Sequence, residues 1–164
     1  LAKGRDFDRP YFEKADCVVT ISEQCVQELV KAFPDLADKF ICIYNLNPEK
    51  KIREKALEFY PEEYQNCKGL KLISIGRLNY QKGFDYAIEA ARILKDKGVE
   101  FSWFIIGSGE LKDALEEQIR SLGVEKSVYL LGERENPYPY IQNADIVVQT
   151  SRFEGKSIVL DDVI

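Results

Sequence analysis

The loop at residues 76–83 carries two cations directly after an apolar run, residues 70–75. The guanidinium of Arg77 is a planar fork that can bind two phosphate oxygens at once, and the ammonium of Lys82 is a mobile point charge. Together these groups suit a diphosphate. The alternative interpretation is a pair of solvated loop cations, since a single loop motif often matches by chance.

A second segment whose residues could bind a ligand, residues 151–162, follows a later apolar run and leads into a predicted helix. Backbone N–H groups at the start of a helix are free to bind an anion, which the helix dipole also favours, so residues 155–158 predict a second phosphate contact. Glu154 and Asp162 stand eight positions apart and would reach two parts of one elongated ligand. The alternative interpretation is an acidic first turn that only stabilises the helix dipole. It explains Asp161 well, but it explains Glu154 less well because that residue precedes the helix.

Two nucleotide-binding motifs are incomplete in this chain. Residues 155–157 read GKS, like the end of a P-loop, but Thr150 stands where the first glycine is needed. Residues 107–109 read GSG, like the start of a dinucleotide fingerprint, but Lys112 replaces the third glycine. We therefore expect neither an ATPase nor a nicotinamide-dependent enzyme.

No metal site is expected. Asp6 and Asp8 are paired carboxylates, but no strand precedes them, and we interpret that stretch as a solvated segment. The chain has no histidine, and its cysteines are too far apart for a zinc site and are interpreted as reduced. They are Cys17, Cys25, Cys42 and Cys67.

The composition is that of a soluble protein with a core of its own. Apolar residues make up 45% of the 164 residues, charged residues 31%, and the net charge is −5. The lack of basic excess argues against nucleic acid as a partner. No run approaches the roughly 20 apolar residues that span a bilayer, and no signal peptide is recognised. We expect a cytoplasmic chain, and the absence of Met suggests a piece of a longer protein.

Strands and helices alternate from residue 70 onward. This alternation predicts a parallel, doubly wound α/β sheet of Rossmann-like type, in which the loops after Ile75, Ile106, Leu131 and Gln149 converge at one edge. The predicted strands are residues 70–75, 101–106, 127–131 and 145–148, and the predicted helices are residues 84–97, 110–122 and 136–142.

The first part of the chain has a different pattern. We predict strands at residues 15–21 and 39–44, with a helix capped by Ser22 between them. This β-α-β unit, residues 1–45, is expected to be the end of a preceding domain. Residues 46–69, with a helix at residues 49–59, are predicted to be a linker, and residues 70–164 a domain truncated at its C-terminal end.

The ordered set of motifs resembles the large retaining glycosyltransferase family four, also called glycosyl transferases group one, with a GT-B fold of two facing domains. The resemblance covers about residues 70–164. It is carried by GRL with KG at residues 76–83, IGSG at residues 106–109, VYLLG at residues 128–132, ADIVV at residues 144–148 and Ser151 with Glu154-Gly155.

The resemblance implies roles for individual residues. Arg77 and Lys82 would bind the donor diphosphate and Glu154 would hold sugar hydroxyls, which makes these three the catalytic candidates. Asp162 stands where the family usually has Glu for the ribose. The donor-binding candidates are Gly76, Gly107, Gly109, Glu133, Arg134, Gly155, Lys156, Ser157, Ile158 and Asp162, with Glu133 and Arg134 beside the nucleobase.

The implied function is that of a hexosyltransferase, of which this chain holds the donor-binding part, inactive alone. It would take a nucleoside-diphosphate sugar, with a UDP-sugar as the expected donor, without metal or other cofactor. The sugar would pass with retention to a saccharide or lipid-linked acceptor, through the N-terminal acceptor domain, in envelope glycan synthesis and in peripheral contact with the inner face of the membrane. The alternative is a non-catalytic nucleotide-sugar-binding module. A response-regulator-like or flavodoxin-like domain would need an acidic or flavin-binding loop after Ile75.

Overall fold

The computed structural model describes residues 5–46 and 48–154, which belong to two compact units. The smaller unit lies within the first 46 residues, and the larger one extends from Pro48 to Glu154. We describe each unit by itself.

The smaller unit has the predicted β-α-β arrangement. β1 (Val18–Thr20) and β2 (Phe40–Cys42) pair in parallel, and α2 (Glu23–Ala32) and the short 3₁₀ helix η1 (Pro34–Lys39) connect them. Ser22 caps α2 as predicted, because its hydroxyl accepts a hydrogen bond from the backbone N–H of Cys25 at 3.2 Å. Both strands are shorter than predicted, since each has only one partner to pair with in this unit.

An additional helix, α1 (Arg5–Lys14), occupies the stretch that we interpreted as a solvated segment. Its Phe12 ring packs edge-on against the rings of Phe33 and Phe40, at centroid distances of 5.4 and 5.7 Å. The ammonium of Lys39 donates to the carbonyl oxygens of Glu13 and Ala15 at the end of the helix, both at 2.8 Å. The local pattern does not reveal α1 because residues far along the chain stabilise it.

The larger unit is built on a parallel sheet in the order β5-β4-β3-β6. The strands are β3 (Leu70–Ile75), β4 (Phe101–Ile106), β5 (Val128–Gly132) and β6 (Ile146–Val147). The chain runs outward from β3 to β5 and returns to place β6 on the other side of β3. The sheet is therefore doubly wound as predicted, with its topological switch point between β3 and β6.

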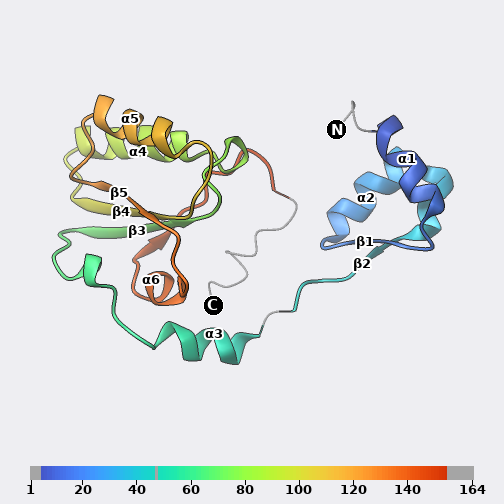
Figure 1. Cartoon of the computed structure of the whole chain (residues 1–164), viewed down its shortest axis with the longest axis horizontal. Coiled ribbons are helices and arrows are strands. Elements are labelled where there is room, and N and C mark those ends of the chain that lie inside the picture. The colour runs from blue at the N-terminus through green and yellow to red at the C-terminus, as the bar shows by residue number, and fades with distance from the viewer. Residues whose placement is uncertain (1–4, 47, 155–164) are drawn as a thin grey trace. The chain divides into compact units, whose positions relative to one another are not determined.

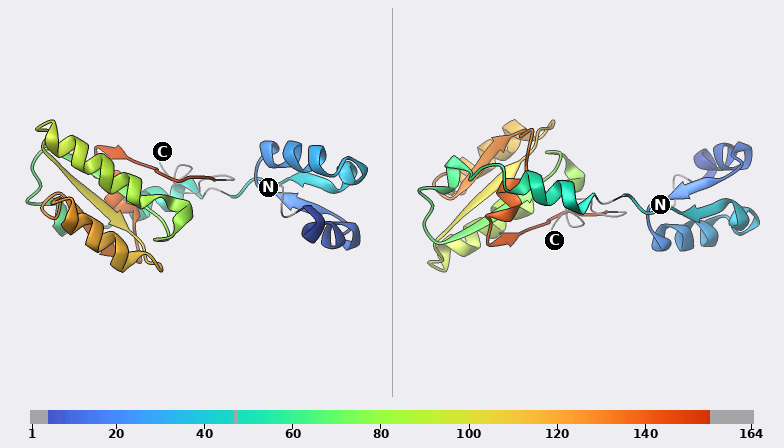
Figure 2. Two further views of the ribbon diagram at one scale, coloured as in Figure 1. Left: turned by 90° about the horizontal axis from the view of Figure 1, so that it is seen from above. Right: turned by 90° about the horizontal axis from the view of Figure 1, so that it is seen from below.

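Helices cover both faces of this sheet. α4 (Phe84–Asp96) and α5 (Lys112–Ser121) lie over one face, and the short α6 (Tyr138–Gln142) lies under the other (Figure 1). From above, α4 and α5 run alongside one another over the strands (Figure 2). The first face buries Leu72, Trp103 and Ile105, and the second buries Ile73, Phe104 and Ile106, so alternate residues of β3 and β4 fill two cores.

Part of the predicted linker packs on the second face. It contains α3 (Glu49–Ala56), three residues shorter than the predicted helix, and the 3₁₀ helix η2 (Glu62–Tyr64). Tyr64 is only 2% exposed, its ring lies 4.7 Å from that of Phe104, and its hydroxyl donates to the carbonyl oxygen of Tyr140 at 3.1 Å. The segment that leads into the sheet therefore contributes to its core.

Candidate functional site

The loops at the carboxyl ends of the strands converge, as predicted. The backbone N–H of Leu78, after β3, donates to the carbonyl oxygen of Ser108, after β4, at 2.8 Å. The N–H of Gly107 donates to the carbonyl oxygen of Gly132, at the end of β5, at 2.9 Å. Three loops from three neighbouring strands thus form one edge of the sheet.

Two glycines make this close approach of the loops possible. A Cβ atom on Gly107 would lie 1.9 Å from the carbonyl oxygen of Gly76, and one on Gly109 would lie 2.3 Å from that of Leu78. The φ angle of Gly107 is 145°, which L side chains rarely adopt. The glycine turn therefore shapes the edge on which a ligand would lie.

An open cleft of about 330 Å³ lies between these loops. It holds Arg77 and four of the predicted donor-binding residues, while Gly109 lies in the adjoining turn. The cleft is lined by Ile75, Gly76, Arg77, Ile106, Gly107, Ser108, Glu133, Arg134 and Pro137.

Arg77 presents an exposed guanidinium to this cleft. No residue within 5–46 or 48–154 forms a hydrogen bond or an ion pair with it. Its backbone is held by the turn, because its carbonyl oxygen accepts from the N–H of Asn79 at 2.8 Å. Its five N–H donors are thus available to an anionic ligand.

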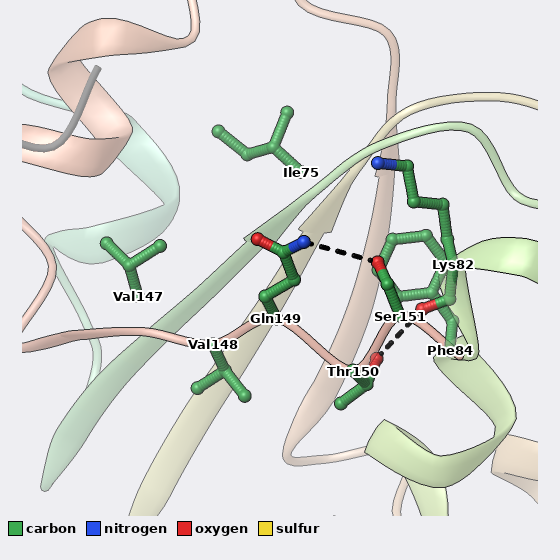
Figure 3. Close-up of a pocket in the computed structure, with 8 residues that line it drawn as sticks. All are labelled: Ile75, Lys82, Phe84, Val147, Val148, Gln149, Thr150 and Ser151. Carbon is green, nitrogen blue, oxygen red and sulfur yellow. Dashed lines mark hydrogen bonds between the residues drawn. The ribbon is translucent and has the colours of Figure 1, made fainter. Parts of the chain in front are cut away.

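Lys82 and Glu154 form an ion pair at the switch point, although 72 residues separate them. Lys82 ends the 3₁₀ helix η3 (Tyr80–Lys82), and its Nζ lies 2.5 Å from Oε1 of Glu154, in the loop after β6. Both side chains are about one fifth exposed, at 22% and 21%. The same Oε1 accepts from the hydroxyl of Ser151 at 2.8 Å, and that hydroxyl accepts from the amide of Gln149 at 3.4 Å (Figure 3 draws the latter bond).

The environment of Glu154 favours its ionised form. Partial burial raises the pKa of the carboxyl group, but the hydrogen bonds from Lys82 and Ser151 and the charge of Lys82 lower it further, so the pKa lies below its usual value. Among the described residues Oε2 has no hydrogen-bond partner. The pair thus combines a carboxylate oxygen free to accept a hydroxyl with an ammonium whose other N–H groups are free to donate.

Arg134 and Glu133, predicted beside a nucleobase, form one wall of the cleft. The guanidinium of Arg134 donates to Glu63 of η2 at 2.8 Å, to the carbonyl oxygen of Leu131 at 2.6 Å and to the hydroxyl of Tyr140 at 3.1 Å. Glu133 accepts a hydrogen bond from the Ser108 hydroxyl. Most donors of Arg134 are thus used within the protein, while its contact with a ligand stays a prediction.

Comparison with known proteins identifies the family. The sequence model of the glycosyl transferases group 1 matches residues 58–161, more than half of the chain. The chain belongs to this family. The match includes the cation-bearing loop after β3, the glycine turn after β4 and the Glu154 segment.

Curated relatives agree with this family membership. The chain is 34% identical over 149 residues to an N-acetylgalactosamine-N,N'-diacetylbacillosaminyl-diphospho-undecaprenol 4-alpha-N-acetylgalactosaminyltransferase of Campylobacter jejuni, covering 91% of this chain and 39% of that protein. It is 28% identical over 147 residues to an uncharacterised glycosyltransferase of Methanocaldococcus jannaschii, covering 88% and 36%. The chain thus spans less than half the length of these relatives.

Solved structures share the fold. A mutant of the S. aureus protein TarM, in complex with fondaparinux, alpha-GlcNAc-glycerol and UDP, superposes with a TM-score of 0.75 at 21% identity, covering 98% of this chain and 30% of that one. The pneumococcal O-GlcNAc transferase GtfA, in complex with UDP and GlcNAc, gives a TM-score of 0.74 at 21% identity, covering 96% and 30%. The group 1 glycosyltransferase fold is thus present in this chain.

Gln149 is a polar residue of the candidate site that the motifs did not indicate. It ends the apolar stretch after Asp145, beside a small space of about 10 Å³ that Lys82 and Ser151 also line (Figure 3). Its Oε1 is buried without a partner among the described residues. The space is about that of one water molecule, which this oxygen would bind. In the sequence, the one indication of this role is that the polar residue Gln149 ends an apolar run.

The remaining predicted residues of the group 1 site, Gly155, Lys156, Ser157, Ile158 and Asp162, lie outside the described residues. Within the described ranges, the four cysteines are free, and no three His, Cys, Asp or Glu residues are grouped closely enough to hold a metal ion. None of the described helices is long and apolar enough to span a membrane.

The Glu63–Arg134 ion pair leads to a prediction about pH and stability. Partial burial raises the pKa of Glu63, but the hydrogen bonds from Arg134 and Tyr140 lower it further, to below its ordinary value of 4.5. A carboxyl with a lowered pKa stabilises the fold above its ordinary value, and this contribution is lost as the pH falls through the lowered one. We expect Glu63→Gln to reduce the free energy of unfolding at pH 7 by about 1 kcal/mol, a value discounted for partial exposure.

Urea unfolding of the wild type and of Glu63→Gln at pH 7 and pH 3 checks this expectation. The difference in unfolding free energy should be smaller at pH 3 than at pH 7, because the contribution of the ionised Glu63 is lost as the pH falls below its ordinary pKa and through the lowered one. A difference of equal size at both pH values would show that the charge of Glu63 contributes nothing.

Proposed function

We propose that this chain carries the donor site of a group 1 glycosyltransferase and binds a nucleoside-diphosphate sugar, with a UDP-sugar as the expected donor. In the intact protein the sugar, a hexose, passes with retention to a saccharide or lipid-linked acceptor in envelope glycan synthesis. The observation that supports this most is the Lys82–Glu154 pair at the switch point, together with the guanidinium of Arg77, which no residue of the described ranges pairs.

The charges fit the two ends of such a donor. A diphosphate in the cleft would receive hydrogen bonds from Arg77 on one side and from the free N–H groups of Lys82 on the other. The hexose would then lie beside Glu154, whose Oε2 accepts a hydroxyl. The similar proteins support this assignment, since two structural neighbours are complexes with UDP and a relative is an N-acetylgalactosaminyltransferase.

The chemistry would be electrostatic. When the bond between the sugar C1 and the diphosphate oxygen breaks, its electron pair stays on the diphosphate. The oxygen of the acceptor hydroxyl forms the new bond to C1, and its proton passes to the departing diphosphate. Arg77 and Lys82 would stabilise the charge on the leaving diphosphate. In this proposal these cations supply the positive charge and no metal ion is needed. Glu154 favours the enzyme over a nucleotide-binding module, because a site for the nucleotide alone does not need it.

Calorimetric titration of the chain with UDP, GDP, ADP and UDP-sugars tests the proposal. We expect saturable binding of UDP, tighter binding of a UDP-sugar, and no change in affinity when EDTA replaces Mg²⁺. Binding of ADP or GDP in preference to UDP would assign a different nucleotide to the donor sugar. If none of these compounds bound, the proposed donor site would be contradicted.

A further inference from the structure

Arg152 stands two residues before Glu154, but its side chain does not face the cleft. Its guanidinium carbon lies 4.1 Å from the ring centroid of Tyr80 and 4.2 Å from that of Tyr86, so the group is stacked between two aromatic faces. Only 14% of the side chain is exposed. A cation so covered is removed from the surface on which a phosphate would bind.

The donors of Arg152 are directed at the protein. Nη1 donates to Oδ1 of Asp85 at 2.9 Å and to the carbonyl oxygen of Tyr80 at 2.7 Å, and Nη2 donates to Oδ2 of Asp85. Asp85 lies in the first turn of α4, directly after the loop that carries Arg77 and Lys82. The two-oxygen contact fixes the plane of the guanidinium as well as its position.

Backbone contacts extend this attachment on both sides of Arg152. Its own N–H donates to the carbonyl oxygen of Gln81 at 2.8 Å, and the side-chain amide of Gln81 donates to the carbonyl oxygen of Phe153 at 3.1 Å. The hydroxyl of Thr150 donates to the carbonyl oxygen of Lys82 at 3.1 Å (Figure 3). The loop after β6 is therefore attached along its length to η3, whose last residue is Lys82.

We propose that Arg152 is a positioning residue that, through Asp85 and the two tyrosine rings, holds Glu154 in place beside Lys82 for the sugar of the donor. This inference rests on the proposed function. A prearranged carboxylate binds a sugar hydroxyl without losing side-chain freedom at that moment, whereas a free loop must first be ordered. Arg77 and Lys82 lie on the loop before α4, where the N–H of Lys82 donates to the side-chain oxygen of Asn79 at 3.1 Å, so we expect the nucleotide part of the donor to bind without Arg152.

The test compares the affinities for UDP and UDP-GlcNAc in the wild type, Arg152→Ala and Arg152→Lys, each first checked by thermal unfolding. The sugar ratio is the dissociation constant of UDP divided by that of UDP-GlcNAc. We expect this ratio to fall by roughly tenfold in Arg152→Ala, with the affinity for UDP within about twofold of the wild type. Arg152→Lys should not restore the ratio, because an ammonium cannot make the planar two-oxygen contact. Arg92→Ala, which removes the exposed Arg92–Asp96 pair of α4, is the matched control and should leave the ratio unchanged.

A measurement without ligand separates this inference from the proposed function. Carboxyl NMR should follow the titration of Glu154, whose pKa we expect to rise toward its ordinary value in Arg152→Ala as the carboxylate moves away from Lys82. An unchanged sugar ratio in a folded Arg152→Ala would overturn the positioning role. If the wild type bound no nucleotide, the donor site would fail, and the Glu154 titration alone would then decide whether Arg152 holds Glu154 beside Lys82.

Discussion

The double substitution Arg77→Ala and Lys82→Ala is expected to weaken the binding of UDP by at least about 100-fold. A hydrogen bond to a charged group contributes about 1.5–3 kcal/mol, and the variant removes at least one from each end of the diphosphate. The loss of Lys82 also leaves the Glu154 carboxylate unpaired beside the phosphates. Calorimetry with UDP measures the effect, and Lys82→Ala should be the more damaging single change.

The control for this prediction is a double variant with the same change in net charge. Arg92 and Arg120 are paired with Asp96 and Glu117 on the outer helices α4 and α5. Replacing both by Ala should leave UDP binding within about twofold, because exposed charges more than roughly 10 Å away are screened. If the two double variants weakened binding equally, the effect would be one of net charge, and Arg77 and Lys82 would not be ligands.

The substitution Gly107→Ala is expected to cost the larger unit about 3 kcal/mol or more and to deform the cleft. The backbone angle alone costs about 1–3 kcal/mol for a residue with a Cβ. In addition, the new Cβ would lie 1.9 Å from the carbonyl oxygen of Gly76, so the loops after β3 and β4 must separate. We expect the melting temperature to fall by roughly 10 °C or more and UDP affinity to fall with it.

Gly98→Ala isolates the backbone part of this cost. Gly98 also has a positive φ, 72°, but a Cβ there would meet nothing within 4 Å. We expect a loss of only about 1–2 kcal/mol in Gly98→Ala, with the affinity for UDP unchanged. Circular dichroism melts of both variants make the comparison, and equal losses of stability would show that the loops adapt to the added methyl group.

The parts of the fold that could be predicted are those whose local pattern agrees with their tertiary environment. β3 and β4 begin and end where predicted, because their branched and aromatic runs are buried between two layers of helices. By contrast, α1 depends on Phe12 packing against Phe33 and Phe40, which no local pattern reveals. β6 is shorter than predicted because, among the described strands, only β3 pairs with it.

The candidate site was predictable as a set of residue types, whereas its geometry was not. The motifs indicated Lys82 and Glu154 separately, but their ion pair depends on the parallel pairing of β3 with β6, which joins segments 72 residues apart. The resemblance places Arg134 beside a nucleobase, which stays a prediction, and no local pattern indicated the ion pair of its guanidinium with Glu63 of η2. Arg152 carried no signal in the sequence, because its environment consists of two tyrosine rings on another segment.

The attachment of β6 has a consequence for amide hydrogen exchange. β6 is joined to the sheet through two residue pairs, Leu72↔Ile146 and Ile73↔Val147, and by the hydroxyl of Ser74, which donates to the carbonyl oxygen of Val148 at 2.7 Å. β4 is hydrogen-bonded on both sides, so its amides should exchange only through global unfolding, whereas those of β6 should exchange through a local opening of lower free energy. A donor held by the loops after both β3 and β6 would slow exchange in β6 most. Binding should therefore change the exchange rates more in β6, at the edge of the sheet, than in β4 at its centre.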